Sequence, residues 1–151
     1  MNSYEYEFAV KCTDKLLENP LCIEFTNPIS RNETWSEAYF SIIKKPMDLS
    51  TVKSNLEQQY YGNLDEWKQD IFQIWANGKE FNGPRTLLYV ICEVLEKKCT
   101  KMFSRVPRTE NDLIKFKVER INKKIKKLLD MELPENSLAP RAPIETLNQA
   151  V

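Results

Sequence analysis

The sequence predicts an all-α fold: a bundle of four helices, a long loop between the first two, and a further basic helix near the C-terminus. Four separate stretches place apolar residues at steps of three and four, the period of an amphipathic helix. No stretch alternates apolar and polar residues as a half-buried strand would. With 151 residues, 42% of them hydrophobic, the chain is long and apolar enough for one packed domain with room at its ends.

The first predicted helix covers residues 4–18 and is followed by the long loop. Phe8, Cys12 and Leu16 stand four residues apart, with charged residues between them. This helix should end at Asn19-Pro20, because the residue before a proline is disfavoured in the α region. Helical periodicity fails from residue 20 to residue 48, although many residues there are apolar. A loop of this length and composition has to pack, and such loops commonly shape a pocket.

Three further helices complete the predicted bundle. Asp48 can cap a short one, whose inward-facing residues are Leu49, Val52 and Leu56. Asn63 and Glu66 have the spacing of a capping box and open the third helix. Its apolar residues are Trp67, Ile71, Ile74 and Trp75. After a predicted break at residues 81–84, the last helix carries Leu88, Ile91, Leu95, Cys99 and Met102 on one face.

Composition excludes several classes of catalytic and binding site. Histidine is absent, which removes His-based triads and imidazole zinc sites. Three glycines form no phosphate-binding loop. The four cysteines form no Cys-x-x-Cys pair, and we expect them to be buried, reduced core residues. The sequence therefore predicts no catalytic residue, no metal and no cofactor. Without a signal sequence or a membrane-length apolar run, we expect an intracellular protein that does not contact membranes.

The formal net charge of zero hides two oppositely charged parts. Residues 1–104 hold twelve basic and fifteen acidic residues, whereas residues 105–131 hold nine basic and four acidic ones. We therefore expect a bundle at residues 1–104, a basic amphipathic helical extension at 105–133, and a proline-containing disordered tail or linker at 134–151.

Two motifs together indicate a function. The first is Tyr39-Phe40-Ser41-Ile42-Ile43-Lys44-Lys45-Pro46-Met47-Asp48-Leu49-Ser50-Thr51-Val52, and the second, some thirty residues later, is Asn77 followed by Phe81-Asn82. In this pattern and spacing the chain resembles a bromodomain over residues 4–104. The resemblance implies a left-handed four-helix bundle that binds acetyl-lysine without being an enzyme. It also implies a nuclear protein whose partners are acetylated histone tail peptides or other acetylated proteins.

The resemblance also assigns roles to residues of the pocket. Acetylation turns the lysine ammonium into a neutral amide on an apolar stem, which an apolar pocket can accept. The amide of Asn82 would donate to the acetyl carbonyl, and the hydroxyl of Tyr39 would hold a water that bridges to it. Phe81 would shield the Asn82 contact, and Asn77 would brace the loop between the last two helices. The implied apolar walls are Phe25 at the floor, Ile29 on the long-loop side, and Leu88.

The chain departs from the family pattern at the entrance of the long loop. Ile23-Glu24-Phe25 replaces the usual Trp-Pro-Phe shelf, so the shelf is less aromatic and carries a carboxylate. Glu37-Ala38 stands where Pro-Asp is usual and should loosen that turn. Trp35 has two readings: it replaces part of the missing shelf, or it anchors the loop in the core. A competing hypothesis for the whole module is a bundle with a vestigial pocket that acts as a structural, dimerisation or DNA-contacting unit.

The basic extension carries a short heptad pattern. Its apolar positions are Ile114, Val118, Ile121, Ile125 and Leu128. This stripe could pack on the bundle or extend from it, associate with a second copy, or accompany a weak contact between residues 105–131 and DNA phosphates. We expect the first arrangement, and a monomer rather than a homodimer.

Overall fold

The computed structural model describes residues 1–131, and every regular element in that part of the chain is helical. The elements in order are α1 (Ser3–Leu17), the 3-10 helix η1 (Pro20–Phe25), α2 (Ser36–Ile42), α3 (Leu49–Glu57), α4 (Leu64–Asn82), α5 (Leu87–Phe103) and α6 (Glu110–Leu129). The predicted all-α class is therefore confirmed. The tail predicted at residues 134–151 lies outside the described residues.

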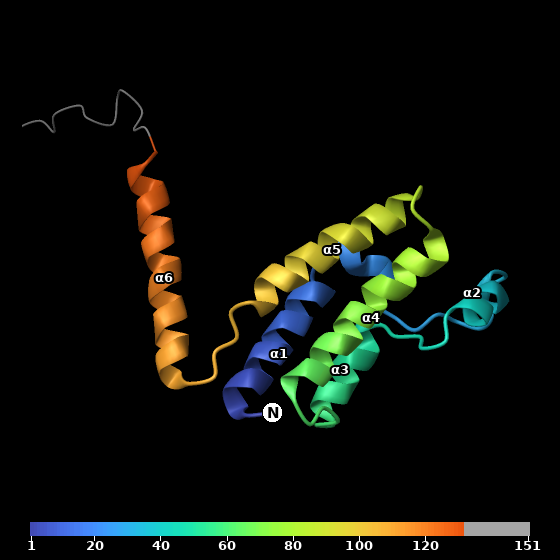
Figure 1. The fold of residues 1–151 in the computed structure, drawn as a ribbon, viewed down its shortest axis with the longest axis horizontal. Helices are drawn as coiled ribbons and strands as arrows, with labels where there is room; N and C mark the ends of the chain where they lie inside the picture. The colour runs from blue at the N-terminus through green and yellow to red at the C-terminus, as the bar shows by residue number, and fades with distance from the viewer. Residues whose placement is uncertain (132–151) are drawn as a thin grey trace, which may run out of the picture. The chain divides into compact units, whose positions relative to one another are not determined.

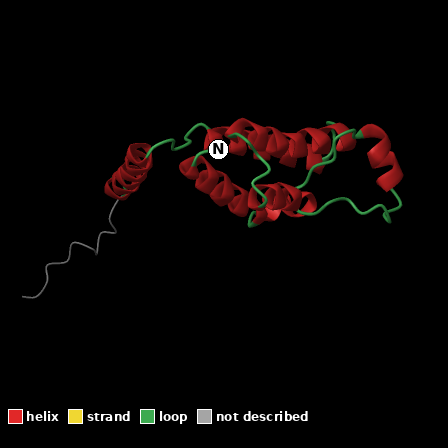
Figure 2. Ribbon diagram, turned by 90° about the horizontal axis from the view of Figure 1, so that it is seen from below, coloured by secondary structure: helices red, strands yellow, loops and turns green. Residues whose placement is uncertain are grey.

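Helices α1, α3, α4 and α5 form the bundle (Figures 1 and 2). α4 and α5 pack along each other and are joined by the short connection at residues 83–86. α1 packs against α3 and α4. The segment between α1 and α3 carries η1 and α2, and α2 lies at the end of the bundle where α4 ends and α5 begins.

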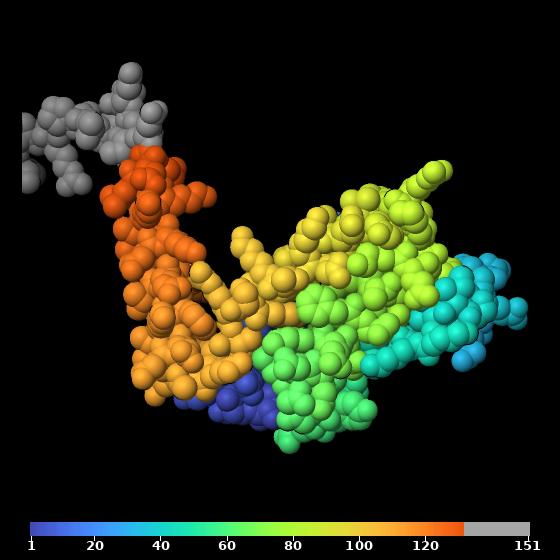
Figure 3. Space-filling view, in the orientation of Figure 1, coloured from blue at the N-terminus to red at the C-terminus, as the bar shows by residue number. Residues whose placement is uncertain are grey.

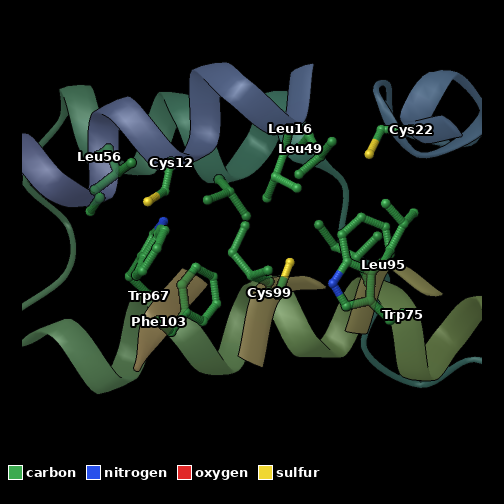
Figure 4. Packing of buried hydrophobic residues seen from close by; sticks show 14 of the residues in the cluster. Cys12, Leu16, Cys22, Leu49, Leu56, Trp67, Trp75, Leu95, Cys99 and Phe103 are labelled. Carbon is green, nitrogen blue, oxygen red and sulfur yellow. The ribbon is translucent and has the colours of Figure 1, made fainter. Parts of the chain in front are cut away.

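The core takes large side chains from all four bundle helices (Figure 4). Leu16, Leu49, Trp75 and Leu95 are each at most 1% exposed. Burial of an aliphatic or aromatic side chain of this kind contributes about 1.5–3 kcal/mol, so each of these residues stabilises the bundle. The polar atom of a second core tryptophan is paired, because Trp67 Nε1 donates to Thr13 Oγ1 at 3.1 Å.

Two helix starts test the predicted caps. Asp48 caps α3 as expected: its carboxylate accepts from the Thr51 backbone at 2.8 Å and from the hydroxyl groups of Ser50 and Thr51 at 2.7 Å each. At α4 only half of the predicted capping box forms. Asn63 accepts from the backbone of Glu66, but the Glu66 carboxylate accepts from Gly62 N and from the Asn63 side chain and not from the Asn63 backbone. The backbone donor that Glu66 uses is thus Gly62 N, at 2.8 Å, in the turn before α4.

The long segment between α1 and α3 is more ordered than the sequence pattern predicts. It contains η1 and α2, which are six and seven residues long. Helices of six or seven residues span only about two turns, which is too short to show a repeating apolar face. Glu37-Ala38, which we expected to loosen a turn, lies inside α2. The segment is tied to the bundle because Ser50 N donates to Thr26 O at 2.9 Å.

Helix α6 has its own N-terminal cap. Asp112 accepts from the backbone of Arg108 and Thr109, and Thr109 Oγ1 accepts from the backbone of Asp112. None of its residues is buried, and the apolar stripe predicted there is about half-exposed.

The described chain divides into two compact units at residues 116 and 117. No helix within residues 1–131 is both long and apolar enough to span a bilayer.

The four cysteines are buried and unpaired, as predicted. Burial raises the pKa of the Cys12, Cys22 and Cys92 thiols to about 11 and that of Cys99 to about 12. The thiolate is the reactive form of cysteine. Since the pKa values are raised, these thiols stay protonated and unreactive well above neutral pH.

We therefore expect the folded chain to react very slowly with a disulfide reagent at pH 8. At that pH about one thiol in a thousand is ionised when the pKa is 11. The reaction should speed up as the pH rises toward 11, and all four thiols should react at once in denaturant. Titration of free thiols against time, with and without guanidinium, measures this. Rapid labelling of the folded chain at pH 8 would contradict the burial.

Candidate functional site

A cavity of about 660 Å³ lies at the end of the bundle, between the long segment and the C-terminal half of α4. The space-filling view shows α2 (cyan) against α4 (green) on this side (Figure 3). The sequence-predicted site residues all line this cavity: Phe25, Ile29, Trp35, Tyr39, Asn77, Phe81, Asn82 and Leu88. The structure thus brings together residues that are up to 63 positions apart in the chain.

One face of α4 supplies a whole side of the cavity. The α4 residues on its wall are Ile74, Asn77, Gly78, Phe81 and Asn82. Their spacing of three, four, seven and eight residues places them on one face of a helix. We predicted a break at residues 81–84, but α4 continues through Asn82. The helix ends there because Gly83 is its C-cap, with a φ of 73°. That positive φ is one that glycine adopts readily.

The floor of the cavity depends on a glycine that the sequence analysis missed. A Cβ atom at Gly78 would lie 2.5 Å from Cys92 Sγ and 2.9 Å from Phe25 Cε1. Only a residue without a side chain lets α5 and Phe25 approach α4 this closely. Phe25 in turn meets Trp75 edge to face, with ring centroids 5.3 Å apart. A lone glycine inside a helical pattern was the available signal, since it often marks close packing.

The Asn82 side chain is held by its own helix. Its Nδ2 donates to Gly78 O at 2.8 Å, and the residue is half-buried. A primary amide has two N–H donors and a carbonyl acceptor. One donor is therefore used to orient the group, and the second is available to a molecule in the cavity.

Asn77 is buried and ties α4 to the long segment. Its Nδ2 donates to Lys45 O at 2.8 Å, while its Oδ1 accepts from Gln73 Nε2 at 2.7 Å. We expected Asn77 to brace the loop between α4 and α5, so this expectation was wrong. The reason is tertiary: the side chain points from α4 toward the backbone just before Pro46, which sequence position alone does not reveal.

Tyr39 places a hydroxyl group in an aromatic wall. It is 5% exposed, and its ring lies 5.2 Å from Phe81 and 5.3 Å from Phe40, nearly perpendicular to Phe40. Burial raises the pKa of Tyr39, and a hydrogen bond with Asn77 partly offsets that effect. The hydroxyl is therefore protonated at neutral pH and can both donate and accept a hydrogen bond.

Trp35 belongs to the wall of the cavity. Its ring lies 5.7 Å from Phe81 and 6.3 Å from Tyr39, yet the residue is 43% exposed. A residue this exposed is no anchor in the core. That Trp35 replaces part of the aromatic shelf stays a prediction.

Further lining residues were not selected from the sequence. They include Glu24, Pro28, Glu33, Met47 and Thr51, which come from separate turns and helix starts. Glu24 was expected only as a carboxylate at the entrance of the long loop, and Thr51 lies in α3. The tertiary fold brings all five residues to the same cavity. Among residues 1–131 no group of three or more metal-ligating side chains is gathered, here or elsewhere.

Comparison with known proteins finds one family. The family model described as "Bromodomain" matches residues 9–94. The histone acetyltransferase GCN5 of Debaryomyces hansenii is 33% identical over 92 residues, which are 61% of this chain and 20% of that protein. The transcription factor GTE1 of Arabidopsis thaliana is 29% identical over 116 residues, which are 76% of this chain and 30% of that protein. The chain thus spans less than a third of either curated relative.

A solved structure shares the fold. It is the second bromodomain (BD2) of Candida albicans Bdf1, bound to an imidazopyridine. The TM-score is 0.63 at 26% sequence identity, and the match covers 68% of this chain and 99% of that one. The similarity to the acetyltransferase carries no acetyltransferase activity to this chain, since it covers only a fifth of that protein and the family matched is a binding module.

The contact at Gly78 leads to a prediction about the cavity. Gly78→Ala should lower the free energy of unfolding by about 1–3 kcal/mol, because the new methyl group overpacks Cys92 and Phe25. Thermal melting measures the loss, and the fluorescence of Trp75 should change as Phe25 moves.

Gly62→Ala is the matched control. A Cβ atom there would lie 3.6 Å from the Glu66 carboxylate, an ordinary contact, so stability should change by less than about 0.5 kcal/mol. Equal melting temperatures for the two variants would contradict the close approach at Gly78.

Proposed function

The chain belongs to the bromodomain family, and from this premise we propose that its bundle binds acetylated lysine in the cavity formed by the long segment and α4. The observation that carries the proposal is that one cavity combines apolar and aromatic lining residues with the oriented amide of Asn82 and the protonated hydroxyl of Tyr39. An acetylated side chain presents a complementary combination, a long apolar stem that ends in a neutral amide.

In this proposal Asn82 makes the direct contact. The N–H that is not bonded to Gly78 donates to the acetyl carbonyl oxygen. Because the other N–H is already committed within the helix, the amide is oriented before the ligand enters, and little side-chain entropy is lost on binding. Phe81, half-buried beside Asn82, shields this hydrogen bond from bulk water.

Tyr39 contributes through water. Its buried hydroxyl holds a water molecule that bridges to the same carbonyl, a contact nearly as favourable in enthalpy as a direct hydrogen bond. Phe25, Ile29 and Leu88 surround the aliphatic stem, and Trp35 covers part of the entrance. Asn77 acts indirectly by holding the backbone at Lys45 against α4.

The ligand we propose is an acetylated histone tail peptide, or another acetylated protein, in the nucleus. Support comes from the relatives, which are named as a histone acetyltransferase and a transcription factor. We propose no enzymatic activity for the bundle.

The basic residues of α6 support a second, weaker activity, contact with DNA phosphates. Lys123, Lys124, Lys126 and Lys127 lie within one stretch of exposed helix. Cationic side chains release counterions when they neutralise phosphates, so even a few such residues give salt-dependent, sequence-independent binding. An acetylated histone tail lies beside DNA, which makes the two activities compatible.

The first prediction tests the direct contact. Asn82→Ala should weaken binding of an acetyl-lysine peptide by about 1–3 kcal/mol, the cost of a lost buried hydrogen bond, with the fold intact. Isothermal calorimetry measures the affinity and circular dichroism checks the fold. Asn32→Ala, in an exposed residue that does not line the cavity, is the control and should bind as the wild type does. Unchanged affinity in Asn82→Ala would overturn the assignment.

The second prediction concerns the charge of the ligand. An unmodified lysine peptide should bind at least about tenfold more weakly than its acetylated form, because the apolar wall leaves an ammonium group desolvated. Equal binding of both peptides would mean general electrostatic attraction. No acetyl-dependent binding at all would favour the competing hypothesis of a vestigial pocket.

The third prediction concerns α6. The full chain should bind duplex DNA with an affinity that falls steeply as salt increases. Changing Lys123, Lys124, Lys126 and Lys127 to Gln should lower that affinity and flatten the salt dependence, while acetyl-lysine peptides without DNA bind unchanged. DNA affinity equal to that of the wild type would rule out this contact.

A further inference from the structure

We propose that the cavity selects acetylated lysines that have a positively charged side chain close by in the peptide, through the carboxylates of Glu24 and Glu33. This inference rests on the proposed function, because it names the subclass of acetyl-lysine ligand that the site prefers.

The charged residues on the cavity wall are all acidic. They are Glu24, Glu33 and Asp48, and no lysine or arginine side chain lines the cavity. Asp48 is 7% exposed, and its carboxylate is occupied by the cap of α3. The cavity therefore offers a ligand two carboxylates from the long segment.

Neither of these two carboxylates has a partner in the described part of the chain. Glu24 and Glu33 are both exposed, and within residues 1–131 no hydrogen bond or ion pair is formed by either side chain. Two neighbouring cations are engaged elsewhere. Lys45 pairs with Asp70 at 2.7 Å, and the guanidinium of Arg31 lies 4.4 Å from the centre of the Phe40 ring. The negative charge at the cavity is thus not neutralised by the protein itself.

The cavity has room for more than one side chain. About 660 Å³ lies in the range of roughly 300–1,000 Å³ that holds a drug-sized molecule, which is larger than an acetylated lysine side chain. Residues next to the acetylated lysine therefore lie at the same cavity, near its wall. A cationic side chain there approaches Glu24 or Glu33, whereas an acidic one is repelled.

The carboxylates of Glu24 and Glu33 add an electrostatic attraction that the uncharged acetyl-lysine cannot provide. Acetyl-lysine itself brings no charge, so Asn82 and the apolar wall recognise it without electrostatic steering. Unpaired carboxylates at the entrance add attraction for a basic peptide, and such charges mainly raise the association rate and the selectivity. Exposed ion pairs are weak, and each carboxylate should change affinity by about twofold to fivefold, more at low salt.

The experiment compares two sets of short synthetic peptides with blocked ends and one central acetyl-lysine. In one set each peptide carries one Arg, at one of the positions from three before to three after the acetyl-lysine, and in the other set Gln stands at that position. Each peptide is also made with unmodified lysine. Affinities are measured at low and moderate salt for the wild type and for Glu24→Gln, Glu33→Gln and the double variant. Glu57→Gln at the end of α3 is the control, since it removes the same charge from a residue that does not line the cavity.

We expect at least one Arg position to bind about threefold or more tightly than its Gln counterpart. The preference should shrink in each single variant, disappear in the double variant, and persist in Glu57→Gln. All variants should bind the Gln peptides as the wild type does.

Three results would overturn the inference. Equal binding of the Arg and Gln peptides by the wild type refutes the selectivity while acetyl-dependent binding remains. A preference that survives in the double variant places the cation elsewhere. If the wild type binds no acetylated peptide more tightly than its unmodified form, both this inference and the proposed function fail. Acetyl-dependent binding without a preference for Arg means that this inference alone fails.

Discussion

The close packing of Phe25 and Cys92 on the backbone of α4 at Gly78 is the contact on which the rest of the site depends. Because Gly78 has no side chain, α5 approaches α4 at the level of the cavity floor, and Phe25 fills the remaining space at the end of η1. The carbonyl of the same residue accepts the hydrogen bond that orients Asn82. Gly78, which has no functional side chain, thus permits the close packing at the cavity floor and orients the amide of Asn82.

The long segment keeps its shape through a small number of polar ties to the bundle. Asn77 holds the backbone at Lys45, Asp48 closes the first turn of α3, and Ser50 N bonds back to Thr26 at the end of η1. Between these ties the aromatic rings of Trp35, Tyr39 and Phe81 pack against each other. α4 therefore carries the amide of Asn82 and one side of the cavity, and the long segment, held at its ends, supplies the Tyr39 hydroxyl and other parts of the wall.

In the proposed function, the apolar part of the cavity wall recognises the ligand and the exposed carboxylates attract it, so different residues serve the two roles. The inner wall is apolar and aromatic and would penalise an ammonium group, whereas the carboxylates of Glu24 and Glu33 stand where solvent reaches them. Burying a charge costs more than an exposed ion pair gains. A site of this kind can exclude the unmodified lysine from its interior and still attract basic residues beside the acetylated one. The basic helix α6 concentrates the opposite charge in a different part of the chain.

What the sequence by itself determined is the helical class and the core positions of the bundle, and its resemblance to a known family implied the eight residues gathered at the cavity. Helix periodicity and caps such as Asp48 are local properties, and the motif around Tyr39 and Asn82 has a specific spacing. Tertiary structure alone decided that α2 forms within the long segment, that Asn77 ties α4 to Lys45, and that Trp35 faces the cavity. It also decided that Glu24 and Glu33 reach the same wall. The reason is physical: these features depend on contacts between residues far apart in the chain, and a local pattern carries no record of which distant surface a side chain will meet.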